Sequence, residues 1–268
     1  MISFPNIKIN IGLDILERRS DGYHNIESLF YPVNYTDILE ILPNDRFELI
    51  NKGIIIDSPE EKNLCYKAWK LIDDNHKIGP VKIILYKNVP FGTGLGSGSS
   101  DAAFTLKMLN EMFELQLSEE KLIEYASQIG ADCAFFIKNK PVLATDIGTK
   151  FQDTNIDLTG YYLVLCIPDV AVKTANAYKN CKPHFPDKKL EDLLKLPVQN
   201  WKDNIKNDFE ESIFPEHPIL AEIKKELYEK GAIYAQMSGS GSAIYGIFDE
   251  SPDNININSC KNKIIIAI

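Results

Sequence analysis

The sequence lacks the cysteine pattern of a secreted disulfide protein or of a zinc protein. Its five cysteines are odd in number and widely spaced, and no two of them form a Cys-x-x-Cys pair. Disulfide frameworks use an even set of cysteines, and structural zinc sites commonly contain Cys-x-x-Cys pairs. The cysteines therefore indicate free thiols in a reducing cytoplasm rather than bridges or metal ligands.

Long apolar runs and an excess of positive charge are also missing. No apolar run approaches the ~20 residues that cross a bilayer. The first residues are not a basic segment followed by an apolar one, as in a secretory signal. The formal net charge of −9 argues against general nucleic-acid binding. We therefore expect a cytoplasmic protein with neither a nucleic-acid nor a membrane partner.

Hydrophobic periodicity predicts a mixed fold in two lobes, α+β or α/β, and the 268 residues suffice for two moderate domains. The polar segment 146–160 has no helical periodicity, so we place a domain junction there, between domains at 1–152 and 153–268. Alternating or short apolar runs predict strands at 7–13, 37–42, 47–50, 81–86, 161–167, 233–237, 243–248 and 263–268. Apolar residues at helical spacing predict helices at 62–75, 102–113, 118–129 and 219–231, with Ser118 as an N-cap and Gly130 as a C′ stop.

The most informative segment that is present is the loop within 90–103, which reads PFGTGLGSGSSDAA. Glycines allow backbone amides to approach an anion closely, and the helix predicted after the loop adds unpaired amides at its positive end. This combination is typical of a phosphate cradle, although a flexible loop or tight turn is the alternative interpretation. The loop is not a P-loop, because no lysine follows its last glycine. Nor is it a dinucleotide fingerprint, because Ser97 stands where the third glycine belongs.

Several other polar residues have both a functional and a purely structural interpretation. The second glycine-serine loop, Ser238–Ser242, is either a hairpin turn or a second contact to the same ligand. Lys8 is on the polar face of a predicted strand, where a lysine is usually solvated. Asp132 follows a glycine that ends a helix, where an aspartate is usually a turn residue. Tyr23 and His24 would ordinarily be turn residues as well.

Taken together, these segments resemble the three motifs of the GHMP kinases, at 6–10, 90–103 and 237–242, which span nearly the whole chain. Within that superfamily, RSDGYH at 19–24 and GADCAFF at 130–136 resemble the R-x-D-G-Y-H and G-A-D-x-x-F-F patterns of the 4-diphosphocytidyl-2-C-methyl-D-erythritol kinase family. The resemblance implies a two-lobed α+β fold. Its N-terminal lobe would be similar to ribosomal protein S5 and its C-terminal lobe would be a ferredoxin-like α/β unit.

The resemblance also implies a reaction: ATP-dependent phosphorylation of the C2 hydroxyl of 4-diphosphocytidyl-2-C-methyl-D-erythritol, in the methylerythritol phosphate route to isoprenoid precursors. Asp132 is implied to accept the proton of that hydroxyl or to orient it, and Lys8 to hold both groups and offset developing negative charge. A nearby lysine weakens an aspartate as a base, which is tolerable if orientation matters more than early deprotonation. Mg²⁺ is expected to be carried by the nucleotide, with Ser100 as a candidate contact and no dedicated metal ligands.

The remaining site residues are assigned by the same resemblance. Tyr23 and Tyr178 are implied to stack on cytosine and His24 to bind its edge. Lys8 and Lys87 are expected to supply the positive charge that a P-loop carries within its own motif. The residues implied to bind the acceptor are Asn10, Tyr23, His24, Thr174, Tyr178, Ser238, Gly239 and Ser240. The residues implied to bind ATP are Asn63, Lys87, Pro90, Gly92, Gly94, Leu95, Gly96, Ser97, Gly98, Ser99 and Ser100, of which the first two match positions near adenine.

Two alternatives stay open. The first is another GHMP kinase, acting on homoserine or a mevalonate derivative, against which the residues 21–24 argue. The second is a non-catalytic sensor with the same fold, against which the retained Lys8 and Asp132 argue. One segment departs from the family pattern, because 250–262 is short, rich in asparagine and weakly helical where a longer helix is common. We expect a monomer or a weak homodimer.

Overall fold

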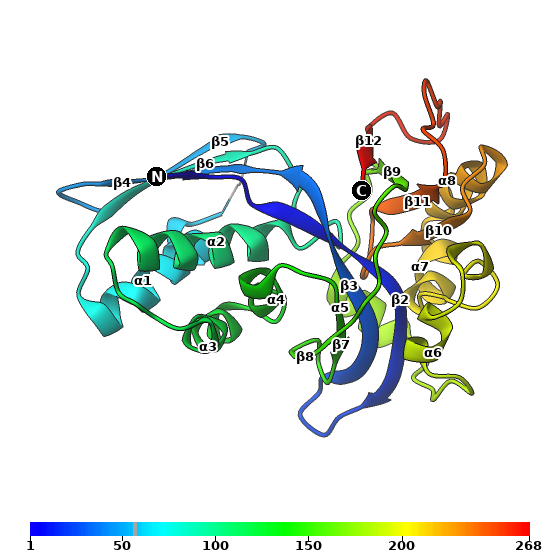
Figure 1. Cartoon of the computed structure of the whole chain (residues 1–268), viewed down its shortest axis with the longest axis horizontal. Helices are drawn as coiled ribbons and strands as arrows, with labels where there is room; N and C mark the ends of the chain where they lie inside the picture. The colour runs from blue at the N-terminus through cyan, green and yellow to red at the C-terminus, as the bar shows by residue number, and fades with distance from the viewer. Residues whose placement is uncertain (56–57) are drawn as a thin grey trace. The chain divides into compact units, whose positions relative to one another are not determined.

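Figure 1 shows the computed structural model of the chain, which describes residues 1–55 and 58–268. The chain divides into two compact units, each built from several segments. The first unit comprises Met1–Ile7, Tyr35–Phe91 and Gly96–Lys140, and the second comprises Lys8–Asn34, Gly92–Leu95 and Pro141–Ile268. The predicted division at residues 152 and 153 stays a prediction, because these units are defined by contacts and the first 152 residues contribute to both.

The first unit is a four-stranded sheet with helices on one face (Figure 1). Strand β4 is antiparallel to β1 and β6, whereas β5 runs parallel to β6. Alternate residues such as Leu39, Ile41 and Ile83 are fully buried, as expected for strands with one covered face. The elements are β1 (Ile2–Ser3), β4 (Ile38–Pro43), β5 (Glu48–Gly53), β6 (Val81–Lys87), η1 (Glu60–Lys62), α1 (Leu64–His76), α2 (Ser97–Met112), α3 (Glu119–Ile129) and α4 (Cys133–Lys138).

The ends of these helices follow the local sequence in most cases. Ser118 caps α3 as predicted, because its hydroxyl accepts a hydrogen bond from the Lys121 amide at 3.3 Å. Gly130 ends α3 as predicted, and its φ of −176° is extended rather than left-handed. Helix α2 begins at Ser97, five residues before the predicted start at 102, so the serines of the glycine loop form its first turn. This places the loop directly at a helix N-terminus.

The second unit contains two further four-stranded sheets, ordered β2-β3-β7-β8 and β10-β11-β9-β12. In the latter every pairing is antiparallel, and α8 packs on β10 and β11 (Figure 1). The elements are β2 (Asn6–Arg18), β3 (His24–Thr36), β7 (Val142–Thr145), β8 (Lys150–Asp153), β9 (Tyr162–Cys166), β10 (Tyr234–Met237), β11 (Ile244–Phe248), β12 (Lys263–Ala267), α5 (Thr174–Asn180), α6 (Leu190–Leu194), η2 (Val198–Asn200), α7 (Phe209–Glu216) and α8 (Pro218–Glu229). The first residues of β2 and the last of β3 belong to the first unit.

An apolar core joins α8 to its sheet in this second unit. Ile223 and Leu227 of α8 are fully buried in one cluster with Val164 and Ile244 of the strands. These positions carry the apolar periodicities that predicted a helix at 219–231 and strands at 161–167 and 243–248, and the strands are confirmed to within one residue. The mixed α+β class is confirmed. Among the described residues, no helix is long and apolar enough to cross a membrane.

A half-buried acid in β2 makes the stability of the second unit depend on pH. Burial, together with the nearby carboxylates of Asp208 and Glu27, raises the pKa of Asp14 from 3.8 to about 7, against an opposing effect of His184. Because the pKa is higher in the folded chain than in the unfolded one, folding favours the protonated acid. The free energy of unfolding should therefore fall as the pH rises from about 4 through about 7.

The variant Asp14→Asn is expected to remove this loss, because an asparagine keeps the shape of the side chain and does not ionise. At about pH 8 its free energy of unfolding should exceed that of the wild type by about 2–4 kcal/mol, and near pH 4 the two should be close. Urea unfolding at both pH values measures the difference, with the exposed Asp45→Asn as the control. Equal stabilities at pH 8 would contradict the raised pKa.

Candidate functional site

Lys8 and Asn10 lie in the interior of the second unit, although they alternate with apolar residues along β2. Their exposed fractions are 3% and 2%, so the interpretation of Lys8 as a solvated lysine is wrong. Both faces of this part of β2 are covered, since every residue from Asn6 to Leu13 is buried. The Lys8 ammonium donates a hydrogen bond to Asn10 Oδ1 and lies 4.8 Å from the centroid of the Phe30 ring. A buried ammonium held by a neutral amide and an aromatic face keeps its positive charge uncancelled by these two partners.

The second glycine-serine loop, Ser238–Ser242, contacts both β2 and the first half of the glycine loop at 90–103. It connects the antiparallel strands β10 and β11, so the hairpin interpretation is confirmed. The Asn10 amide donates to Ser238 Oγ at 3.2 Å, and Ser238 Oγ in turn donates to the Gly94 carbonyl at 2.9 Å. A Cβ atom on Gly94, whose φ is +80°, would lie 1.9 Å from the Ser238 carbonyl oxygen. Only glycine permits this approach, which explains one glycine of the first loop by packing.

The second half of the first loop forms the start of α2, in the first unit. Gly96 is the N-cap residue and no side chain caps the helix, so its first amides lack the usual side-chain acceptor. The hydroxyl of Ser100 is fully buried and has no hydrogen-bond partner within the described residues. Open amides, a positive helix end and a buried hydroxyl are the groups that bind a phosphate.

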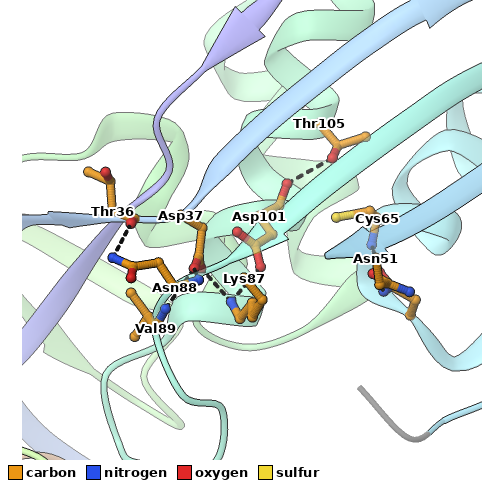
Figure 2. Close-up of polar contacts among 10 residues, drawn as sticks. Thr36, Asp37, Asn51, Cys65, Lys87, Asn88, Val89, Asp101 and Thr105 are labelled. Atoms are coloured by element: carbon orange, nitrogen blue, oxygen red, sulfur yellow. Dashed lines mark hydrogen bonds and ion pairs between the residues drawn. The ribbon is translucent and has the colours of Figure 1, made fainter. Parts of the chain in front are cut away.

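Lys87, which directly precedes the loop, is buried in an ion cluster, as Figure 2 shows. Its exposed fraction is 2%, and its ammonium donates to Asp37 Oδ2 at 2.5 Å and to Asp101 Oδ2 at 2.7 Å. Asp37 Oδ1 also accepts from the backbone amides of Asn88 and Val89, at 2.6 and 2.8 Å. The cluster therefore ties the end of β6 to the second turn of α2, one on each side of the loop. With two carboxylate partners, Lys87 does not carry the free positive charge expected of it.

Burial opposes the charges of Lys87 and Asp101 in this cluster. Burial raises the pKa of Asp101 to about 7, although Lys87 acts in the opposite direction. Burial also opposes the charge on Lys87, but the carboxylates of Asp101 and Asp37 raise the pKa of the lysine above its ordinary value. Oδ1 of Asp101 is buried without a hydrogen-bond partner within the described residues. Lys87 thus stays charged at neutral pH, where the carboxyl group of Asp101 is close to its pKa.

Asp132 occupies the turn between α3 and α4 in the first unit. It is the residue immediately before α4 and makes no capping hydrogen bond to that helix. The turn is closed by a hydrogen bond from the Cys133 amide to the Gly130 carbonyl at 3.1 Å. Asp132 is therefore a turn residue, as the structural interpretation held, and its carboxylate is not used to cap the helix that follows.

The aromatic residues implied to bind cytosine all lie in the second unit, and their stacking on the base stays a prediction. Tyr178 of α5 stacks on His24, with ring centroids 5.0 Å apart and planes inclined by 21°, and its edge contacts Phe209. Tyr23 is 61% exposed and does not form this stack. Thr174, at the start of α5, shares a hydrogen bond of 2.9 Å with Ser240. Burial and the nearby Arg18 lower the pKa of His24, which keeps its imidazole neutral at pH 7.

The predicted site residues divide between the two units. In the second unit are Lys8, Asn10, Tyr23, His24, Gly92, Gly94, Leu95, Thr174, Tyr178, Ser238, Gly239 and Ser240. In the first unit are Asn63, Lys87, Pro90, Gly96, Ser97, Gly98, Ser99, Ser100 and Asp132. Asn63 caps α1, because its Oδ1 accepts from the Cys65 amide at 2.9 Å.

Three polar residues of these networks were missed by the sequence analysis. Asp37 and Asp101 pair with Lys87, and Ser28 contacts Asn10. The sequence did contain a signal for Asp101. It stands between the glycine loop and the apolar helical pattern that begins at Ala102, a position at which a charged side chain has to be buried. No signal in the sequence marks Asp37 or Ser28, because their partners lie 50 and 18 residues away.

Comparison with known proteins identifies the family of the chain. Residues 63–140 match the family model of the GHMP kinases N terminal domain, and residues 189–258 match that of the GHMP kinases C terminal domain. The 4-diphosphocytidyl-2-C-methyl-D-erythritol kinase of Bacteroides fragilis is 54% identical over 252 residues, which cover 92% of each chain. The enzyme of that name from Cytophaga hutchinsonii is 44% identical over 268 residues, covering 100% of this chain and 99% of its own.

Solved structures show the same relationship. A crystal structure of 4-(cytidine 5′-diphospho)-2C-methyl-D-erythritol kinase has a TM-score of 0.81 and 30% identity, over 94% of this chain and 91% of its own. The homoserine kinase of Cytophaga hutchinsonii, at 17% identity, has a TM-score of 0.67 over 98% of this chain and 95% of its own, which shows a shared fold alone. The chain therefore belongs to the GHMP kinases and, within them, to the family of 4-diphosphocytidyl-2-C-methyl-D-erythritol kinases.

Proposed function

We propose that this protein transfers the γ-phosphoryl group of ATP to the C2 hydroxyl of 4-diphosphocytidyl-2-C-methyl-D-erythritol. The observation that carries the proposal is the buried Lys8 ammonium, held by Asn10 and Phe30 in a chain that belongs to this family. Burying a charged amine is costly, and a purely structural position would be filled more stably by an apolar side chain. A non-catalytic sensor has no use for this charge, so the arrangement favours an enzyme.

ATP would bind through the glycine loop and the first turn of α2. The uncapped amides of that turn and the orphaned Ser100 hydroxyl fit a phosphate group. The described residues contain no cluster of three or more His, Cys, Asp or Glu side chains that could hold a metal ion. Mg²⁺ would therefore be held mainly by the triphosphate, with Ser100 as a protein contact, and when bound it would neutralise phosphate charge.

The two catalytic residues would divide the work on the acceptor hydroxyl. Asp132 would accept a hydrogen bond from the C2 hydroxyl and orient its oxygen towards the γ-phosphorus. Lys8 would offset the negative charge that develops on the transferred group. Because phosphoryl transfer is loose, the hydroxyl needs to be positioned more than deprotonated early, and a carboxylate can do both.

The cytidine part of the acceptor would be bound by the aromatic residues of the second unit. The neutral imidazole of His24 can both donate and accept a hydrogen bond, which suits the mixed edge of cytosine. The stack of His24 on Tyr178 fixes the plane of the imidazole. The exposed ring of Tyr23 would offer a flat surface on which cytosine could stack. The partner of the enzyme is thus a small molecule, and we propose that it acts as a monomer or a weak homodimer.

The proposal predicts a narrow acceptor range. ADP release should be fast with the cytidine diphosphate compound and at least ~100-fold slower with its uridine analogue, because uracil reverses the donor and acceptor at the recognised edge. A CMP-containing analogue, which lacks one phosphate, should also be poor. Homoserine and mevalonate derivatives serve as controls for the other GHMP kinases, and turnover of one of them in preference to the cytidine compound would contradict the assignment.

Asp132→Asn should separate proton uptake from substrate binding. The amide oxygen could still accept a hydrogen bond from the hydroxyl, but an amide cannot take up the proton that the hydroxyl loses during the transfer, so kcat should fall by about 10²–10⁴-fold. The KM values for both substrates should change little, because the carboxylate is needed in the transition state rather than for binding. Steady-state kinetics with both substrates measures this split. A variant with a kcat near that of the wild type would exclude Asp132 from the reaction.

Lys87 supports the nucleotide site, in our proposal, through its ion cluster. Because Asp37 and Asp101 hold its ammonium, the lysine would fix the two ends of the loop rather than contact phosphate. Lys87→Met would leave two buried carboxylates without a cation, at a cost of about 3–5 kcal/mol in the free energy of unfolding. The KM of the Lys87→Met variant for ATP should rise at least ~10-fold, because the loop would no longer be fixed, while its KM for the acceptor changes little.

A second variant distinguishes this role from direct phosphate binding. Asp37→Ala removes one anchor, so it should also weaken ATP binding if the cluster positions the loop. If Lys87 bound phosphate directly, the same change would release its ammonium and leave ATP binding equal or tighter. Lys82 is on the same strand as Lys87 and forms a partly exposed ion pair with Glu48 of β5, so Lys82→Met is the matched control and should cost no more than ~1 kcal/mol.

A further inference from the structure

Ser28 is connected to Lys8 through a single intervening side chain, that of Asn10. Ser28 is fully buried in β3. The Lys8 ammonium donates to Asn10 Oδ1, Asn10 Nδ2 donates to Ser28 Oγ at 2.9 Å, and Ser28 Oγ donates to the Gly12 carbonyl at 2.6 Å. An ammonium and an amide NH₂ group can only donate and a carbonyl oxygen can only accept, so the direction of each of these three hydrogen bonds is defined.

The direction of these hydrogen bonds matters because the amide group of asparagine has an oxygen that accepts and an NH₂ group that donates. Rotated by half a turn, Asn10 would present its NH₂ group to the Lys8 ammonium, and two donors would face each other. Ser28 prevents this rotation, since its hydroxyl proton is engaged by Gly12 and only its lone pair is left for Asn10. The oxygen of Asn10 is thereby kept on the side of Lys8.

The main chain around Asn10 is fixed independently of Ser28. The Asn10 amide donates to Ser238, and its carbonyl accepts from the Tyr245 hydroxyl at 2.7 Å. The Gly12 carbonyl that anchors Ser28 is also fixed, because the Gly12 amide donates to Gln236 Oε1 at 2.8 Å. Gly12 has a φ of +66°, and a Cβ atom there would lie 2.6 Å from Leu190. Ser28 therefore controls the orientation of one side-chain amide rather than the path of the strand.

We propose that Ser28 is a positioning residue for the phosphoryl transfer, which acts by holding the Asn10 oxygen against the ammonium of Lys8. The inference rests on the proposed function, in which Lys8 stabilises the transferred phosphoryl group. A lysine has a flexible stem of four carbons, and catalysis by a point charge requires that its ammonium be held in place before the reaction. Ser28 touches neither substrate in this account and acts only through Asn10.

The experiment compares Ser28→Ala, Ser28→Val and Ser28→Thr with the wild type, using ATP and 4-diphosphocytidyl-2-C-methyl-D-erythritol. Valine and threonine have the same shape, and only threonine retains the hydroxyl. We expect kcat to fall about 10–100-fold in the alanine and valine variants, with KM values within ~3-fold of the wild type, and threonine to restore kcat. Ser212→Ala, which removes a side-chain to backbone hydrogen bond in α7, is the control and should leave kcat unchanged.

A double-mutant cycle with Asn10→Asp tests the orientation argument itself. A carboxylate has two equivalent oxygens, so it cannot turn a donor towards Lys8. Adding Ser28→Ala to Asn10→Asp should therefore change the residual kcat less than ~3-fold. A loss as large as in the wild-type background would show that Ser28 acts in some other way.

The outcomes separate the role of Ser28 from the proposed function. An inactive wild type with this acceptor would overturn the function and the inference that rests on it. An active wild type whose valine and threonine variants have equal kcat values would overturn only the role of Ser28. Parallel losses of kcat, of both KM values and of melting temperature in all three variants would show that Ser28 is a packing residue, which also overturns the inference.

Discussion

Each buried ammonium in this protein has to be held by a partner, and this constraint organises the polar interior of both units. Lys8 and Lys87 are almost equally buried, at 3% and 2% exposure, and the ammonium of each donates to buried side chains. Their partners differ in charge. The Lys87 ammonium donates to two carboxylates, and the Lys8 ammonium donates to the neutral amide of Asn10.

In the proposed function, two lysines outside the glycine loop take the place of the P-loop lysine. The ion cluster of Lys87 has no positive charge to spare, and it ties β6 to α2 on either side of the loop. The charge of Lys8 is not cancelled by Asn10, and the network through Ser28 defines the direction in which the amide points. In this proposal, Lys87 supports the architecture of the loop and Lys8 supplies the charge that the reaction requires.

The sequence predicted the order of the elements and the motifs, but not the depth at which the polar residues lie. Alternation along 7–13 correctly indicates a strand, yet it places Lys8 and Asn10 only on the opposite face from the isoleucines. Whether that face is covered depends on segments far away in the sequence, such as the loop at Ser238. The pairing of Lys87 with Asp37 and the stack of His24 on Tyr178 are long-range contacts of the same kind, which no local pattern encodes. The start of α3 was predicted correctly, because capping by Ser118 is a local hydrogen bond.

The central claim is that the phosphoryl group goes to the C2 hydroxyl of the cytidine diphosphate acceptor. The most direct test is ³¹P NMR of the product formed from ATP and 4-diphosphocytidyl-2-C-methyl-D-erythritol. The account predicts one new phosphomonoester signal without proton splitting, because C2 is a tertiary carbon and carries no hydrogen, beside an unchanged diphosphate. A phosphomonoester signal split by carbon-bound protons, or no new phosphomonoester at all, would contradict it.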